Sequence, residues 1–262
     1  MPEPGESSIA LKYGRMENNM WNRVEVKAKG KVGFKRNYWN CVVAALIFSL
    51  VSGGLSGNEQ RITQQVEENY TDPAVFLEFI TTPKVIGGAA VGLAIGVLVF
   101  GALEVGCSRF FLLNQLRPAS VSEVGYGFNH NYWNNVGSIL LRNVFVILGV
   151  ILFIIPGVIM SYQYRMVPYI LSEKPELGPK EVLDYSKQMM EGHKLNSFIY
   201  DLSFIGWMLL SACTLGIVGI FYANPYKYAS DAELYLAIRS GEIKTRETPE
   251  EPEDVHVNTF EL

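Results

Sequence analysis

Hydrophobic residues are gathered into four long stretches, and polar segments separate them. The stretches 38–55 and 85–103 carry no charged residue, and the stretch 197–222 carries only Asp201. The remaining stretch begins near Val144 and continues past Pro156 to Leu171. A helix of about 20 apolar residues crosses the roughly 30 Å hydrocarbon core of a bilayer, where backbone groups must be hydrogen-bonded internally. The pattern therefore predicts an all-α, polytopic membrane helical bundle.

The third and fourth stretches allow two interpretations, because each contains residues that bend or end a helix. Pro156 and Gly157 interrupt the third stretch, and Thr214, Leu215 and Gly216 interrupt the fourth. Each stretch is either one kinked span, since membrane helices tolerate glycine and proline, or a tight hairpin of two short helices. In the second case Pro156, Gly157 and Gly216 reverse the chain, and four spans become six helical segments.

The distribution of basic residues favours six segments. Cytoplasmic loops of membrane proteins carry an excess of Lys and Arg. With six segments, 20 of the 22 basic residues fall on one side, and only Arg61 and Lys84 fall on the other. With four spans the same residues divide 15 to 7. Six segments place both termini in the cytoplasm, so we expect a multi-pass protein of the cell membrane.

A recurring motif predicts three structural units. Residues 33–40 read GFKRNYWN and residues 127–134 read GFNHNYWN, each directly before an apolar run, and a fainter copy runs from Gly192 to Phe198. An amphipathic element precedes each copy, over residues 21–32, 120–126 and 178–190. We therefore expect three hairpins, each preceded by a short interfacial amphipathic helix and an aromatic junction. The expected apolar segments are 38–56, 85–104, 139–155, 157–171, 197–212 and 215–238.

The ends of the chain differ from its apolar middle. We assign residues 1–19 to a polar tail, residues 20–238 to the membrane domain, and residues 239–262 to an acidic tail expected to be disordered. The polar opening and the late first apolar run do not fit a cleavable signal peptide. The net charge of −4 gives no basic field for nucleic acid. The three cysteines are far apart and are interpreted as small buried hydrophobic residues.

Aromatic and basic residues at the segment ends are interpreted as interfacial anchors. Trp39 and Trp133 fall at the expected headgroup level, where an amphipathic indole is favoured. Basic side chains directly before the spans would meet anionic lipids. These side chains are Lys35, Arg36, His130, His193 and Lys194. Membrane lipids are therefore the expected partners.

Small residues predict close helix packing in the second stretch. Gly88, Gly92 and Gly96 recur at every fourth position, a spacing that lets helix backbones approach closely. We interpret this face as an intramolecular packing surface. A homo-oligomer or another membrane protein is the alternative partner for it.

Asp201 is the most suggestive polar residue, because a carboxylate inside an apolar segment is costly and is usually paired. Arg142, Arg165 and Glu104 fall at comparable depths. We expect an ion pair between Asp201 and either Arg142 or Arg165 that bridges two units. The alternative is a proton- or cation-binding site on a transport path.

Sequence motifs for catalysis are missing. The chain contains no HExxH, no Cys/His cluster, no GxSxG and no phosphate-binding glycine loop. We therefore expect no catalytic residues, no metal and no cofactor, and we do not expect an enzyme.

Several longer strings in the sequence are distinctive. They are Ile155-Pro156-Gly157, PYILSEKPELGPKEVLDYSKQMMEGHK at 168–194, LSFIGWMLLSACTLGI at 202–217, Asn224-Pro225-Tyr226 and, near the start, AKGKVGFKRNYW at 28–39. Together they resemble one bacterial integral-membrane family, the domain of unknown function 975. The resemblance covers residues 20–238 and implies a membrane topology without an assigned reaction. The layout is also similar to the membrane domain attached to some glycerophosphodiester phosphodiesterases, but this chain has no room for their catalytic barrel.

Two functional hypotheses follow. The first is a non-enzymatic multi-pass protein of the bacterial cytoplasmic membrane, acting as an envelope scaffold or a lipid-interacting factor. The second is a small transporter or export/immunity factor that uses Asp201 and the nearby Arg and Glu residues.

Overall fold

The computed structural model describes residues 21–51 and 81–247, and these residues form helices and turns without any strand. The helices, in chain order, are α2 (Arg23–Arg36), an apolar helix Tyr38–Val51, α5 (Pro83–Leu116), α6 (Tyr126–Asn129), α7 (Tyr132–Leu152), α8 (Ile154–Gln163), α9 (Val167–Glu173), α10 (Pro179–Met189), α11 (Lys194–Leu202), α12 (Ile205–Cys213) and α13 (Asn224–Glu247). A 3-10 turn, Val121–Gly125, precedes α6, and a π-helical turn, Gly219–Ala223, precedes α13.

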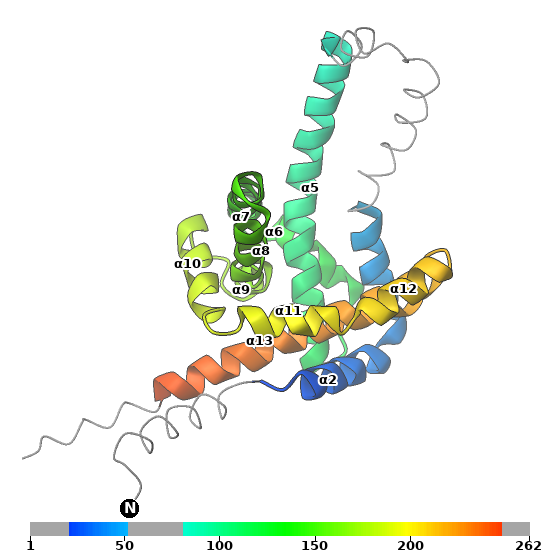
Figure 1. Cartoon of the computed structure of the whole chain (residues 1–262). Coiled ribbons are helices and arrows are strands. Elements are labelled where there is room, and N and C mark those ends of the chain that lie inside the picture. Colours follow the sequence, from blue (N-terminus) through cyan, green and yellow to red (C-terminus); the bar gives the residue numbers. More distant parts are fainter. Residues whose placement is uncertain (1–20, 52–80, 248–262) are drawn as a thin grey trace, which may run out of the picture.

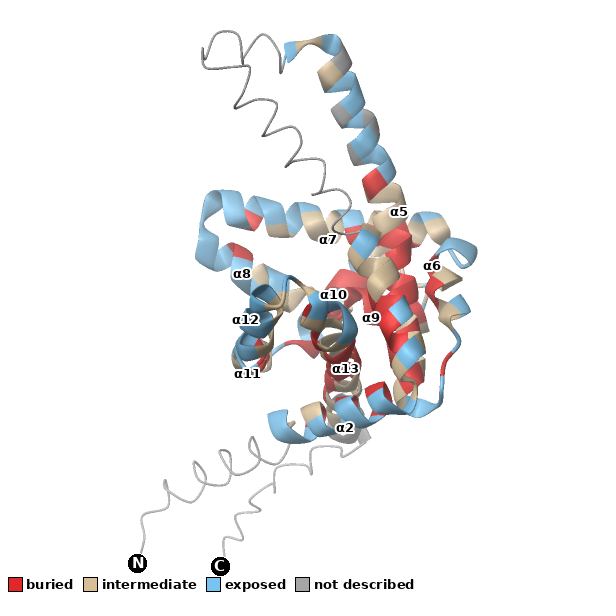
Figure 2. Ribbon diagram, turned by 90° about the vertical axis from the view of Figure 1, so that its right-hand side faces the viewer, coloured by how far each residue is buried: buried red, intermediate tan, exposed pale blue. Residues whose placement is uncertain are grey.

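The hydrophobic core lies where the second half of α5 packs against α9, α13 and α2 (Figure 2). Phe110, Ile170 and Leu234 are fully buried there. Helix α2 lies directly against α13, since a Cβ on Gly30 would lie 2.6 Å from the Cα of Ser230. Only a residue without a side chain allows the two backbones to approach so closely. We call this region the base; it comprises α2, residues 101–116 of α5, α6, α9, α10, α11 and α13.

The first reversal of the chain occurs at Phe153, between α7 and α8. Phe153 is extended, with φ −157° and ψ 139°, and α8 then runs back along α7. Gly149 and Gly157 face each other across this hairpin, because a Cβ on Gly149 would lie 3.0 Å from the Cα of Gly157. The predicted reversal at Pro156 is therefore displaced by three residues. Pro156 instead lies in the first turn of α8, where a missing N–H leaves no helical hydrogen bond unmade.

The second reversal occurs at residues 214–216, where it was predicted. Leu215 and Gly216 both adopt left-handed backbone conformations, with φ 51° and 86°. The N–H of Gly216 donates to the carbonyl of Ser211 (2.8 Å), and the N–H of Leu215 donates to that of Ala212 (3.3 Å). This pair of bonds is the Schellman motif, which ends α12 and turns the chain back.

Three arms project from the base in three different directions (Figure 1; Figure 2). Arm 1 consists of residues 38–51 together with residues 83–100 of α5. Arm 2 consists of residues 144–160 around the Phe153 turn, and arm 3 of residues 205–221 around the Leu215 turn. Exposed large hydrophobic residues are concentrated on the arms.

Several predicted segments differ in extent from the observed helices. The segment 157–171 is broken after Gln163, and its second part is the buried helix α9. Helix α13 continues to Glu247, beyond the predicted boundary at 238, because the residues after 238 retain good helix propensity. The tail 1–19, residues 52–56 and residues 248–262 lie outside the described residues. The predicted interfacial elements correspond to α2, to the 3-10 turn with α6, and to α10.

Two helices of the described part, Ala94–Leu116 and Tyr132–Leu152, are long and apolar enough to cross a membrane. The first is mostly buried inside the protein, whereas the second is mostly exposed. Helices α8 and α12, with 10 and 9 residues, are each about 15 Å long, which is roughly half of a hydrocarbon core.

Candidate functional site

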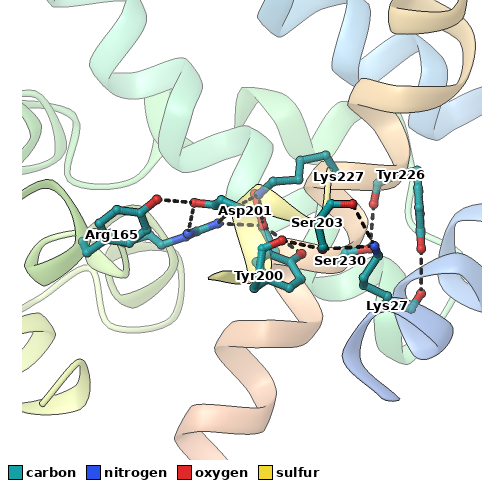
Figure 3. Close-up of polar contacts among 10 residues, drawn as sticks. Lys27, Arg165, Tyr200, Asp201, Ser203, Tyr226, Lys227 and Ser230 are labelled. Carbon is teal, nitrogen blue, oxygen red and sulfur yellow. Dashed lines mark hydrogen bonds and ion pairs between the residues drawn. The ribbon is translucent and has the colours of Figure 1, made fainter. Parts of the chain in front are cut away.

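Four charged side chains form an ion cluster where arms 2 and 3 join the base (Figure 3). Arg165, which follows α8, donates to both carboxylate oxygens of Asp201 on α11, at 2.7 and 3.0 Å. Arg165 also donates to Asp231 on α13, at 2.9 Å. Lys227, one helical turn before Asp231, pairs with Asp231 and lies 2.9 Å from Asp201. Two cations and two carboxylates thus neutralise one another.

Tyrosine hydroxyl groups complete this cluster. Tyr162 donates to Asp201 at 2.9 Å, and the buried Tyr200 donates to Asp231 at 3.1 Å. The guanidinium of Arg165 lies 5.7 Å from both tyrosine rings. The partners come from the end of arm 2 and from α11 and α13, the helices before and after arm 3. The cluster therefore fixes the position of arm 2 relative to arm 3.

A second ion pair joins α5, just below arm 1, to α7, just before arm 2. Arg142 on α7 donates to both oxygens of Glu104 on α5, at 2.7 and 2.9 Å. Such bidentate pairs between a guanidinium and a carboxylate are stronger and more directional than single hydrogen bonds. Of the two partners expected for Asp201, the structure therefore gives Arg165, while Arg142 pairs with Glu104.

Lys27 links α2 to the residues directly before arm 3. Its Nζ donates to the hydroxyl and the carbonyl of Ser203, at 3.1 and 3.3 Å, and lies 4.4 Å from the ring centre of Phe204. Burial, together with the nearby charge of Lys227, lowers the pKa of Lys27. Lys27 therefore adds a hydrogen-bonded contact at the edge of the ion cluster.

A cavity of about 170 Å³ opens between the two ion pairs. Its polar lining includes Glu104, Arg165 and Asp231, and its aromatic lining includes Phe48 and Tyr228. The lining residues come from arm 1, α5, the end of arm 2 and α13, so the cavity lies where the arms leave the base.

The two clear copies of the repeated motif make equivalent contacts. In the first copy, Asn37 and Asn40 both donate to the carbonyl of Ala119, at 2.8 and 3.2 Å. In the second copy, Asn131 and Asn134 both donate to the carbonyl of Pro175, at 2.8 and 3.0 Å. Each carbonyl belongs to the loop that enters the following interfacial element. The spacing of three residues places both asparagines of a copy on one side of the chain, so that they clamp the same acceptor.

Comparison with known proteins gives one match. Residues 121–242 match the family described as protein of unknown function (DUF975). This match confirms the predicted resemblance over residues 121–242, from the 3-10 turn before α6 into α13, whereas the string at 28–39 lies outside the matched region. No curated protein and no solved structure matches the chain.

The ion cluster lies entirely within the DUF975 region, whereas Lys27 and Glu104 lie outside it. Asp231 and Lys227 are members of the cluster that the sequence analysis missed. Asp231 lies in the last predicted apolar segment, so the rule that singled out Asp201 applied to it equally. The spacing of four residues between Lys227 and Asp231 was a second available signal.

The predicted interfacial anchors fall into two groups. Trp39 and Trp133 are exposed, and each packs edge-on against the tyrosine before it, with ring centres 5.2 Å apart. Lys35 and His130 are also exposed. Arg36 is exposed as well but donates to the carbonyl of Asn114, and His130 stacks on the ring of Tyr126 with ring centres 4.1 Å apart. Lys194 donates to Gln163 at 3.3 Å, and Nδ1 of His193 is buried without a hydrogen bond among the described residues.

The small residues of the second apolar stretch and the cysteines depart in part from expectation. A Cβ on Gly88 or Gly92 would meet nothing within 4 Å among the described residues, whereas Gly96 is buried. Cys41 and Cys107 are buried as predicted, but Cys213 is exposed at the tip of arm 3. The apolar run around Cys213 does not face the base, which is why its burial was predicted wrongly.

Proposed function

We propose that this chain is a non-enzymatic, multi-pass protein of the cell membrane that acts as an envelope scaffold or lipid-interacting factor. Its three arms would enter the bilayer from the cytoplasmic side and return to it, while the base would remain at the cytoplasmic surface with both termini. The recurring motif would then mark the three related units from which the arms arise.

The observation that carries this proposal is the exposure of large apolar side chains at the tips of the arms. Residues 152–155, which form the tip of arm 2, are Leu-Phe-Ile-Ile and are 70 to 74% exposed, and Leu215 at the tip of arm 3 is 95% exposed. Contiguous apolar patches of this kind on a protein surface mark contacts with a membrane or another protein.

Hydrogen bonding at the arm tips supports a lipid environment. At the tip of arm 3 the hydroxyl of Thr214 bonds the carbonyl of Leu210 at 2.9 Å and accepts the N–H of Val218 at 3.2 Å. At the tip of arm 2 the N–H of Phe153 bonds the carbonyl of Gly149 at 3.0 Å. The arm 3 turn, which satisfies these groups locally, can lie in hydrocarbon, where water is not available to do so, whereas α8 begins without a side-chain cap at the arm 2 turn.

Leu215 provides a second argument of the same kind. It occupies the left-handed position of the Schellman motif, which usually holds glycine because a Cβ costs about 1 kcal/mol there. An exposed leucine would gain nothing in water to offset this strain. In a bilayer its side chain would gain about 1.5–3 kcal/mol of transfer free energy.

The test is flotation of the full-length protein with phospholipid vesicles after detergent removal. We expect Leu215→Asp to reduce vesicle association roughly tenfold or more, because a charge near the membrane interior is costly. Leu116→Asp is the matched control, since Leu116 is also exposed but lies on the base at the opposite end of α5 from arm 1. Equal losses in both variants would contradict the proposal.

The variant Leu215→Gly distinguishes the effect of Leu215 on folding stability from its effect on membrane association. This variant relieves the left-handed strain, so the free energy of unfolding should rise by about 1 kcal/mol while vesicle association falls. A variant that weakened both properties would contradict the assigned role of the Leu215 side chain.

The second candidate, a small transporter or export/immunity factor, is favoured by the cavity beside the ion cluster. The pairing of Asp201 with Arg165 and Lys227 favours the scaffold instead, since both carboxylate oxygens of Asp201 are already occupied by cationic partners. Ion or solute uptake into proteoliposomes that depends on Asp201 and is lost in Asp201→Asn would decide for the transporter.

A further inference from the structure

The cavity between the ion pairs combines groups that recognise an ammonium ion. The rings of Phe48 and Phe111 each lie 5.6 Å from the ring of Tyr228, and all three line the cavity. Aromatic faces attract cations through the negative charge density above the ring. Asp231 lines the same cavity and supplies a carboxylate.

Asp231 has one oxygen available for a ligand. Its bonds from Arg165, Tyr200 and Lys227 all end on Oδ1. Within residues 21–51 and 81–247 no hydrogen bond ends on Oδ2 of this side chain, so an ammonium group in the cavity could donate to it. Hydrogen bonds in which both partners are charged are about twice as strong as neutral ones.

The charge around the cavity sets the charge of the ligand. Glu104 is neutralised by Arg142, and the pair Asp201 and Asp231 is neutralised by Arg165 and Lys227. A ligand with a net charge would leave that charge uncompensated in a partly buried site, which is costly. A zwitterion that carries an ammonium group avoids this cost.

The position of the cavity points to an amphiphile. Its lining residues stand where the arms leave the base, and exposed apolar side chains continue outward along those arms. A polar head in the cavity would place an attached hydrocarbon chain against the arms.

We propose that this cavity binds the ammonium end of a zwitterionic headgroup, with phosphatidylethanolamine as the type of ligand. The ammonium lies against the rings of Phe48, Phe111 and Tyr228 and donates to Oδ2 of Asp231. The inference rests on the proposed function, since it assumes that the arms stand in lipid. A soluble zwitterion, phosphoethanolamine, carries the same chemical groups and is the other source of the ligand.

The experiment is native mass spectrometry of the full-length protein in detergent, with either phosphatidylethanolamine or phosphatidylglycerol added. We expect one retained phosphatidylethanolamine with roughly tenfold preference over phosphatidylglycerol, which lacks an ammonium group. Equal retention of the two lipids would overturn the proposal. Excess phosphoethanolamine that displaced the lipid completely would support the site and identify the soluble source, whereas persistence of the lipid would support the lipid source.

Two variants and one control make the test specific. Asp231→Asn should weaken retention roughly tenfold, and Phe48→Leu, which leaves the ion cluster intact, should weaken it roughly threefold to tenfold. Glu233→Gln is the control, because it removes a carboxylate from the same helix at a residue that faces Lys29. Unchanged retention in both Asp231→Asn and Phe48→Leu would overturn the proposal.

Vesicle flotation distinguishes this proposal from the proposed function. Phe48→Leu leaves the tips of arms 2 and 3 unaltered, so its flotation should equal that of the parent protein. Normal flotation with no preference between the lipids would contradict the proposed cavity ligand but not the proposed membrane role. Failure of the parent protein to float would instead count against the membrane role.

Discussion

Arms 2 and 3 differ in polarity between their roots, where they join the base, and their tips. At the roots, the side chains of Arg165 and Asp231 are only 15% exposed, and each is paired with opposite charges. At the tips, Phe153 is 72% exposed and Leu215 is 95% exposed. A protein surrounded by water would place charges outside and these apolar side chains inside.

The contrast indicates that different parts of one hairpin face different surroundings. Paired charges hold the roots together in a packed base, and the tips carry side chains that gain free energy only from an apolar neighbour.

Removal of the Arg165 guanidinium should destabilise the region where arms 2 and 3 join the base. Arg165→Ala leaves Asp201 and Asp231 sharing a single cation, Lys227, so one partly buried negative charge is uncompensated, which costs about 3–5 kcal/mol. We expect a loss of this size in the free energy of unfolding, measured by denaturant titration in micelles. Lys29→Ala, which removes the exposed ion pair with Glu25, is the control and should change little. Similar losses in both variants would mean that the cluster has no special role.

Closure of the arm 2 hairpin depends on Gly157. A Cβ there would lie 2.6 Å from the backbone nitrogen of Val150, so Gly157→Ala must push α8 away from α7. We expect a destabilisation of about 1–3 kcal/mol. In Gly137→Ala the new methyl group meets open space, and this variant should gain roughly 0.5–1 kcal/mol from better helix propensity. A neutral or stabilising Gly157→Ala would contradict the close packing of the hairpin.

Lowering the pH should reduce the free energy of unfolding through protonation of His193, and this is the smallest of the three expected effects. Burial lowers the pKa of His193. The unfolded chain therefore binds a proton below about pH 6.5 while the folded protein still holds the imidazole neutral. The free energy of unfolding should be highest above that pH and fall as the pH decreases toward the lowered pKa. In His193→Gln the fall between pH 7 and pH 5.5 should be smaller; an identical slope would show that other groups cause it.

Local signals in the sequence predicted much of the fold. The basic residues and the repeated motif predicted two reversals, and the chain does reverse at Phe153 and at residues 214–216. The displacement from Pro156 to Phe153 arises because a proline fits the first turn of a helix as well as it ends one. The three hairpins were expected to share one orientation, whereas the arms leave the base in different directions. Periodicity describes a helix face and carries no information about how separate hairpins are oriented.

The candidate site was predicted only in part. A carboxylate in a predicted apolar segment implies a nearby cation, which led from Asp201 to Arg165. The contribution of Lys227 and Asp231 depends on α13 returning beside α11, a tertiary contact that a sequence pattern does not reveal. The cavity likewise exists only because Phe48, Tyr228 and Asp231 converge from distant parts of the chain.

Fluorescence quenching at Cys213 tests the central claim most directly. Cys213 is exposed near the tip of arm 3, whereas Cys41 and Cys107 are buried, so a polarity-sensitive fluorophore can be attached at this site before reconstitution into vesicles. If the arms stand in lipid, nitroxides on the lipid acyl chains will quench the fluorophore and aqueous iodide will not. Strong quenching by iodide with none by acyl-chain nitroxides would contradict the account.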